Sequence, residues 1–286
     1  MKGNTTGLAV HPSLFTLHSS QKMHIVVCIK YIPDPEAAFS MFSIDEQARK
    51  IVPASGLKHV VSPFDEQAIE AALRIREAHA GTRITVLTLG DETSRNALKH
   101  GLAMGADDGV LLADAAFNDG DSATTAQALT AAVKKLGAVD LVLTGRQAAD
   151  WDAGIVGAAV GELLGVPVLS FAMRVSVADN YVRVERVLDD GSEIVEVMLP
   201  AVVTVSNEIG SPRAPTLRET MRAARKPIVK WSAVDLGLQV STLAARCVRE
   251  RLFVPVKHGR CELIAGATPE EQGAKLALRL REARVL

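Results

Sequence analysis

The residues best placed to do chemistry in this chain are glycines at the ends of apolar, strand-like runs. Gly90 follows the run 84–89, and Gly145 follows the run 140–144 and opens the turn 146–152 before a helix. A glycine lets a ligand approach the backbone, and free N–H groups at a helix N-terminus attract phosphate. This pattern favours a nucleotide, although the sequence has neither a G-x-G-x-x-G after its first strand nor a Walker A loop.

No side chain or cluster indicates catalysis by the chain itself. The cysteines Cys28, Cys247 and Cys261 contain no C-x-x-C pair, so a zinc site is not expected. An odd and sparse set of cysteines is typical of a reducing compartment, and we expect a cytoplasmic protein. No residue stands out as an acid, base or nucleophile, which predicts a binding or carrier protein and not an enzyme with its own substrate.

The bulk composition excludes other classes of function. The chain has 286 residues, a formal net charge of -1 and 4% aromatic residues, which argues against a nucleic-acid binder. The sequence contains no run of about 18 apolar residues that would predict a membrane span. Residues 1–22 lack the apolar core of a signal peptide, so we expect a disordered N-terminal extension or a start that belongs at Met23.

The elements that must position these glycines alternate along the chain. Apolar runs predict strands at 24–29, 84–89, 109–113 and 140–144, and helical spacing predicts helices at 63–80, 93–104, 122–136 and 154–164. Strands and helices that alternate at this length imply a mostly parallel, doubly wound α/β sheet. Ligands of such sheets bind outside the carboxyl ends of the strands, where Lys30, Gly90 and Gly145 lie.

The second half of the chain changes its period. Alternating residues predict a small β-meander with strands at 167–177, 181–187 and 193–198, followed by a buried strand at 201–205 that returns to the main sheet. Thr216-Leu-Arg-Glu219 is a capping-box pattern that predicts a short helix. Residues 30–35 are expected to form a loop, 42–53 a small hairpin and 269–284 a final helix, whereas 227–265 show no strong period.

Several segments together resemble the beta subunit family of electron transfer flavoproteins. They are Lys30-Tyr-Ile-Pro-Asp34, the stretch 58–66, Ala103-Met-Gly-Ala-Asp107, the stretch 143–150, and 199–204 with 212–217. The resemblance implies a fold like that of the adenine nucleotide alpha hydrolases over residues 23–235, and an extended C-terminal arm at 236–286 that wraps the alpha subunit. It further implies an FAD shared with the alpha subunit, and either AMP or, as in electron-bifurcating members, a second FAD in this chain.

The resemblance also implies which residues contact the nucleotide. They are Cys28, Ser62, Pro63, Phe64, Asp65, Leu89, Gly145, Arg146, Gln147, Ala148, Asp150, Asp152, Ile155 and Val156. Ile155 and Val156 depart from the polar pair that is frequent in the family, so only their backbone N–H groups could reach a phosphate. Trp151 is expected either to pack over the nucleotide or to cap the helix. Asp34 and Pro35 are expected to form a turn or to lie near the shared flavin.

A basic segment is expected to bind a redox partner. By resemblance, 206–226 is a recognition loop in which Leu217 enters a pocket of an acyl-CoA or other dehydrogenase, while Arg213 and Arg218 supply charge. Electrons would then pass through FAD to a membrane or soluble oxidoreductase as acceptor. The alternatives are an electron-bifurcating subunit with a second FAD, a stand-alone nucleotide-binding module of the universal-stress type, and a simple scaffold protein.

Overall fold

The computed structural model describes residues 22–118, 120–255, 259 and 261–285. Two units are distinct: residues 22–43 with 51–249 form the first, and residues 44–50 with the chain from Glu250 onward form the second. The expected N-terminal extension lies almost wholly outside the described residues. Among the described residues, no helix is long and apolar enough to cross a membrane.

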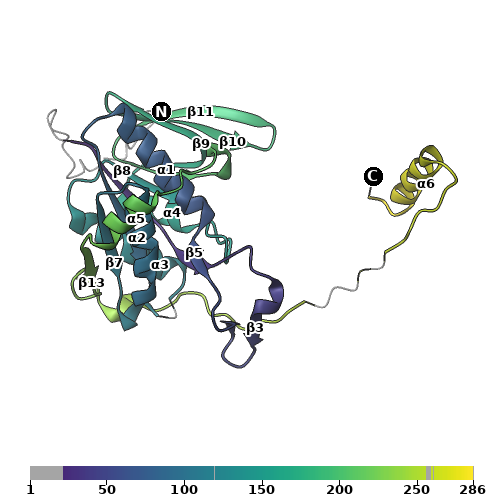
Figure 1. The fold of residues 1–286 in the computed structure, drawn as a ribbon, viewed down its shortest axis with the longest axis horizontal. Helices are drawn as coiled ribbons and strands as arrows, with labels where there is room; N and C mark the ends of the chain where they lie inside the picture. The colour runs from purple at the N-terminus through teal and green to yellow at the C-terminus, as the bar shows by residue number, and fades with distance from the viewer. Residues whose placement is uncertain (1–21, 119, 256–258, 260, 286) are drawn as a thin grey trace, which may run out of the picture. The chain divides into compact units, whose positions relative to one another are not determined.

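The first unit is built on one nine-stranded sheet (Figure 1). In spatial order its strands are β11 (Gly191–Met198), β10 (Tyr181–Leu188), β9 (Val168–Ala178), β12 (Ala201–Val205), β8 (Leu141–Gly145), β1 (His24–Cys28), β6 (Arg83–Leu89), β7 (Asp108–Leu112) and β13 (Ile228–Trp231). All neighbours from β9 to β13 are parallel, and β10 and β11 add an antiparallel meander at one edge. The predicted mostly parallel sheet and its meander are confirmed.

Helices cover both faces of this sheet. The helices α1 (Pro63–Ala78), α2 (Arg95–Met104) and α5 (Leu217–Ala224) lie on one face, and α3 (Ser122–Leu136) and α4 (Val156–Leu164) lie on the other. Strand β1 has apolar side chains to bury on both faces of the sheet. Ile25 and Val27 join the core on the α1 face, and Val26 joins the core on the α3 face. A strand buried on both faces reads as a continuous apolar run, which is how the sequence predicted it.

The remaining strands and turns are short, and two of them, at 42–45 and 50–53, include residues of both units. They are β2 (Tyr31–Pro33), β3 (Phe42–Asp45), β4 (Lys50–Pro53) and β5 (His59–Val61), together with 3-10 turns at Phe39–Met41, Glu92–Ser94, Ala115–Phe117, Asn207–Ile209 and Val240–Leu243. The expectation of a loop at 30–35 was wrong in part, because β2 pairs with β5 in an antiparallel bridge. Strand β13 was not predicted at all: it has only four residues, begins after Pro227 and occupies the sheet edge.

The first unit extends further along the chain than the sequence indicated. Leu243 is buried and packs in the same core as α3. The carboxylate of Asp121 accepts hydrogen bonds from the backbone N–H groups of Arg246 (2.7 Å) and Cys247 (2.9 Å). Residues 236–249 therefore belong to the compact unit, and the separate C-terminal segment begins near Glu250. That segment contains α6 (Pro269–Glu282), which buries none of its residues within the described chain.

Candidate functional site

The ligand position in a doubly wound sheet is fixed by its topology. From β1 the chain moves to β6 and β7, and then returns to β8 on the other side of β1. The strand order therefore reverses between β1 and β8, and ligands of such sheets bind outside the carboxyl ends of these strands, a region called the crevice below. Residues just after these strands, Lys30 and Gly145–Asp152, are those singled out in the sequence.

Asp65 links the ends of the two strands at this point. It sits in the first turn of α1, is buried, and accepts hydrogen bonds from the backbone N–H of Lys30 (2.8 Å) through Oδ2 and of Gly145 (3.0 Å) through Oδ1. Burial raises the pKa of Asp65 to about 7, against the lowering effect of these two hydrogen bonds. The sequence placed Asp65 among the nucleotide contacts, whereas both of its oxygens are engaged by the protein backbone.

Gly145 is required for close packing and not for an unusual backbone angle. A Cβ at this position would lie 2.5 Å from Asp65 Oδ1 and 2.7 Å from Phe64 Cβ. Gly157 is confined in the same way, because its Cβ would lie 2.5 Å from Thr144 Oγ1. The two glycines let β8 approach the start of α1 and let α4 approach β8 closely.

The turn 146–152 is held by polar contacts on both sides. The carboxylate of Asp150 accepts a hydrogen bond from Lys30 Nζ (2.6 Å), and Gln147 Nε2 donates to Asp152 Oδ1 (2.9 Å). The backbone N–H of Ala149 donates to Ser62 Oγ (3.4 Å). The Lys30–Asp150 pair therefore bridges the loop that follows β1 and the turn that follows β8.

Arg146 places a cation directly after the end of β8. Its guanidinium lies over the ring of Phe64, 5.2 Å from the centroid, and its backbone N–H donates to Val205 O (2.8 Å). Arg146 Nε and Asp150 Oδ1 are buried and have no hydrogen-bond partner among the described residues. A guanidinium with an unpartnered donor can bind an anion such as phosphate.

The other residues expected to contact the nucleotide make no polar contact within the described chain that indicates a ligand. Pro63 is exposed in the first turn of α1, Leu89 ends β6, Ala148 lies in the turn and Val156 begins α4. Ile155, just before α4, is 55% exposed and offers no polar side-chain atom to a ligand.

Three further expectations are clarified by local contacts. Cys28 is buried, and burial raises the pKa of its thiol to about 12, so thiolate chemistry is not available to it. Trp151 is half-exposed, and the guanidinium of Arg249 lies 4.5 Å from its ring centroid. Asp34 belongs to a turn, where its carboxylate accepts from the backbone N–H of Glu36 (3.0 Å).

The basic segment 206–226 forms a separate surface feature. Thr216 and Glu219 make the predicted capping box, and α5 follows it. Leu217 is 77% exposed, and Met221 on the next turn is also exposed. Arg218 is exposed beside them, whereas Arg213 is engaged in ion pairs with Glu70 (2.7 Å) and Glu77 (2.8 Å) on α1.

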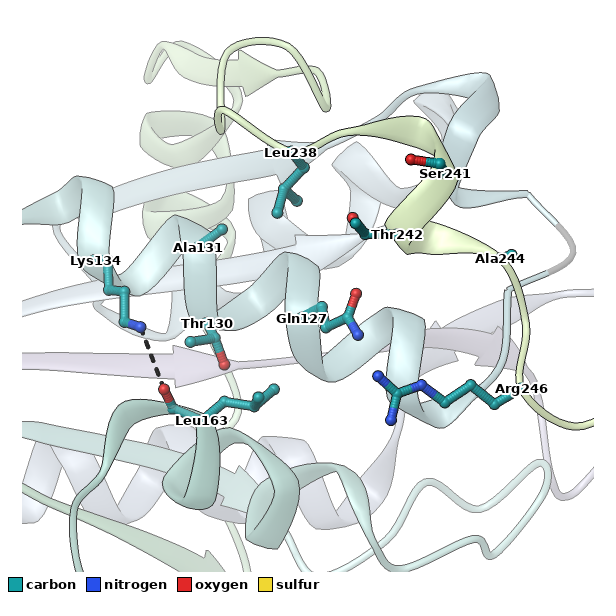
Figure 2. A pocket seen from close by; sticks show the side chains of 10 residues that line it. All are labelled: Gln127, Thr130, Ala131, Lys134, Leu163, Leu238, Ser241, Thr242, Ala244 and Arg246. Atoms are coloured by element: carbon teal, nitrogen blue, oxygen red, sulfur yellow. Dashed lines mark hydrogen bonds between the residues drawn. The ribbon is translucent and has the colours of Figure 1, made fainter.

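A shallow groove of about 700 Å³ lies along α3 (Figure 2). The groove is lined by Gln127, Thr130 and Lys134 of α3. Leu163 of α4 and Arg246, which comes after the 3-10 turn Val240–Leu243, also line it. Lys134 Nζ donates to the carbonyl oxygen of Leu163 (3.2 Å) across one end. None of the residues expected at the nucleotide site lines this groove, so it is separate from the strand-end crevice. The described residues also contain no cluster of three or more side chains that could hold a metal ion.

Fold and site together define a doubly wound α/β protein with a candidate ligand site at the carboxyl ends of β1 and β8. The model of the electron transfer flavoprotein domain matches residues 51–236, more than half of the chain. The chain belongs to the electron transfer flavoprotein family, among the electron carriers of the beta-subunit type. This result confirms the resemblance seen in the sequence motifs.

Several curated relatives cover most of this chain. Subunit CarD of the caffeyl-CoA reductase–Etf complex of Acetobacterium woodii is 34% identical over 92% of this chain and 100% of its own length. The electron transfer flavoprotein subunit beta of Megasphaera elsdenii is 35% identical, with 82% of this chain and 88% of that protein covered. Protein FixA of Azorhizobium caulinodans is 34% identical, with 82% and 85% covered.

Proposed function

We propose that this chain pairs with an alpha subunit, shares one FAD with it, and holds an adenine nucleotide in the crevice between β1 and β8. The observation that carries the proposal is the Nε of Arg146, unpartnered within the described residues, together with the uncapped N-terminus of α4, at the point where the strand order reverses. The chain acts as a redox carrier without a substrate of its own, because the flavin supplies the electron chemistry while the protein supplies placement. Its free thiols fit a reducing compartment such as the cytoplasm.

The residues of the crevice fit a phosphate-bearing ligand. Backbone N–H groups at the start of α4 and the unpartnered Arg146 Nε supply donors. Ile155 and Val156 contribute through their backbones only, since their side chains carry no polar atom. Asp65 supports the site by holding the ends of β1 and β8 together, and Ser62 supports it by holding the turn after β8.

The nucleotide is AMP or the adenylate part of a second FAD. The similarity to a subunit of a caffeyl-CoA reductase–Etf complex is compatible with either alternative, since its name does not state which nucleotide that subunit holds. Co-expression with the neighbouring alpha-subunit gene, followed by acid release and chromatography of the bound nucleotides, decides between them. One FAD and one AMP per heterodimer identify a simple carrier, and two FAD identify a bifurcating one. A colourless chain that is stable alone and binds no adenine nucleotide would refute the proposal.

We also propose that the segment 206–226 docks a donor dehydrogenase through Leu217. Burial of one leucine side chain contributes about 1.5–3 kcal/mol, so Leu217→Ala is expected to weaken docking roughly ten- to hundredfold. Flavin content and heterodimer yield should not change, because Leu217 is 77% exposed and contributes little to the core of this chain. Leu188→Ala, at another exposed leucine on the β10–β11 hairpin, is the matched control. Equal electron-transfer kinetics in the two variants would exclude the docking role.

A further inference from the structure

Arg213 makes an unusually complete set of contacts for a residue in a basic surface segment. Its Nε donates to Glu70 Oε2 (2.7 Å), its Nη2 to Glu70 Oε1 (3.0 Å), and its backbone N–H to Glu70 Oε2 (3.2 Å). Its Nη1 donates to Glu77 Oε1 (2.8 Å). The guanidinium thus holds one carboxylate in a two-pronged contact and a second carboxylate on its remaining nitrogen.

Glu70 is the centre of this cluster and cannot face a partner protein. Its side chain is only 5% exposed. It also accepts from Arg74 Nε (2.9 Å), and Arg74 Nη1 donates to the carbonyl oxygen of Ile209 (2.8 Å). Burial acts to raise the pKa of Glu70, but hydrogen bonds from Arg213 and Arg74 outweigh it, so its pKa is lowered and the carboxylate stays ionised. The cluster therefore fixes 206–213 to α1 at two points, Ile209 and Arg213.

The other end of the segment is fixed independently. Ala223 of α5 is buried, and α5 packs against α2. Lys226 Nζ donates to the carbonyl oxygen of Ala106 (2.7 Å). Anchors on both sides leave Leu217 and Met221 as the exposed apolar side chains between them.

We propose that Arg213 is a positioning residue of the docking segment: it acts through Glu70 and does not itself contact the donor dehydrogenase. This inference rests on the docking role proposed above and deepens it. The charge of Arg213 is already balanced by two carboxylates, so little remains to attract a partner. Electrostatic steering then falls to exposed cations such as Arg218, while the Glu70–Arg213 pair holds Leu217 ready to bind without an ordering cost.

Glu70→Gln, Arg213→Gln and the double variant test this inference. Each is co-expressed with the alpha subunit and reduced by an acyl-CoA dehydrogenase at several salt concentrations. Both single variants should raise KM roughly five- to tenfold, with little change in the limiting rate. The double variant should be no weaker than either single one, because both remove the same contact. It also keeps the net charge, so the salt dependence of association should match that of the wild type.

Three controls separate anchoring from direct contact. Glu77→Gln removes a carboxylate that also binds Arg213 but is 61% exposed, and it should have little effect. Arg218→Gln should reduce the salt dependence, as expected for a steering charge. Arg213→Lys keeps the charge but loses the two-pronged contact, so it should behave like Arg213→Gln.

Each remaining outcome contradicts the inference in a different way. A loss in Arg213→Gln with none in Glu70→Gln, or full activity in Arg213→Lys, would show that Arg213 touches the partner. No loss in either single variant would show that the anchor is dispensable. If Leu217→Ala docks normally, the docking role itself fails and the inference fails with it, whatever the Glu70 variants do.

Discussion

A methyl group at position 145 tests whether close packing between β8 and α1 is needed for nucleotide binding. In Gly145→Ala the new Cβ would lie 2.5 Å from Asp65 Oδ1 and 2.7 Å from Phe64 Cβ, where ordinary contacts start at 3.4 Å. The backbone of Gly145 is not in the left-handed region, so alanine can adopt its φ and the cost is steric. The start of α1 must move, and the hydrogen bond from the Gly145 N–H to Asp65 must lengthen.

The size of the effect follows from these two contacts. Overpacking a well-packed core costs about 1–3 kcal/mol, and a hydrogen bond to a charged group contributes about 1.5–3 kcal/mol. With the hydrogen bond only partly lost, we expect the free energy of unfolding to fall by ~3 kcal/mol and Tm by roughly 6–12 °C. Because Arg146 and the turn move with residue 145, the adenine nucleotide that co-purifies should also decrease. Circular dichroism melts and chromatography of the released nucleotide measure the two effects.

Gly109→Ala is the matched control. Gly109 lies in β7 of the same parallel sheet, and the nearest atoms to an alanine methyl there would be 3.5–3.6 Å away, which is ordinary contact distance. A glycine-to-alanine change without strain is neutral or stabilises by about 0.4–1 kcal/mol. If Gly145→Ala proved as stable and as rich in nucleotide as Gly109→Ala, the reasoning from close approach at the strand end would be refuted.

Two further predictions concern local stability and pH. Thr216→Ala removes the capping box and should destabilise α5 by about 1 kcal/mol, with roughly fivefold faster hydrogen exchange of its amides and an unchanged global melt. Asp65 has a pKa of about 7 in the folded chain and about 4 when unfolded. The folded chain therefore binds more protons between these values, and its stability falls as pH rises from about 4 to about 7. The unfolding free energy of the wild type should decrease relative to Asp65→Asn over this range, and a difference independent of pH would contradict the pKa of Asp65.

Most of the sheet and its helices could be predicted because their signals are local. The buried strands are continuous apolar runs, and the capping box at Thr216 is contained in four residues. Strand β13 was not predicted because its four residues, which include Lys230 and lie at a sheet edge, show no distinct hydrophobic period. Its place is set by pairing with β7, more than a hundred residues earlier in the chain, and no local pattern records such a contact.

The roles of charged residues were harder to predict than their positions. Asp65 lies at the ends of β1 and β8, but the sequence does not reveal that two backbone N–H groups occupy its carboxylate. Arg213 looked like a steering charge because its partner Glu70 is 143 residues away. One signal was present: Glu70 interrupts the apolar run Ala68–Leu73, where a solvated residue has no place. A charge inside an apolar helix face indicates a buried partner, although not which one.

Helix α1 connects the proposed nucleotide site to the proposed docking segment. Asp65, in its first turn, joins the ends of β1 and β8, and Glu70 holds the docking segment. Five residues advance a helix by about 7.5 Å and turn it by about 140°. The two carboxylates therefore point to different sides of one rigid rod, one toward the strand ends and one toward the surface loop. Because a helix of this kind does not change its length, α1 fixes the spacing between crevice and docking segment, and we expect Leu217 to engage a partner without rearrangement of the nucleotide site.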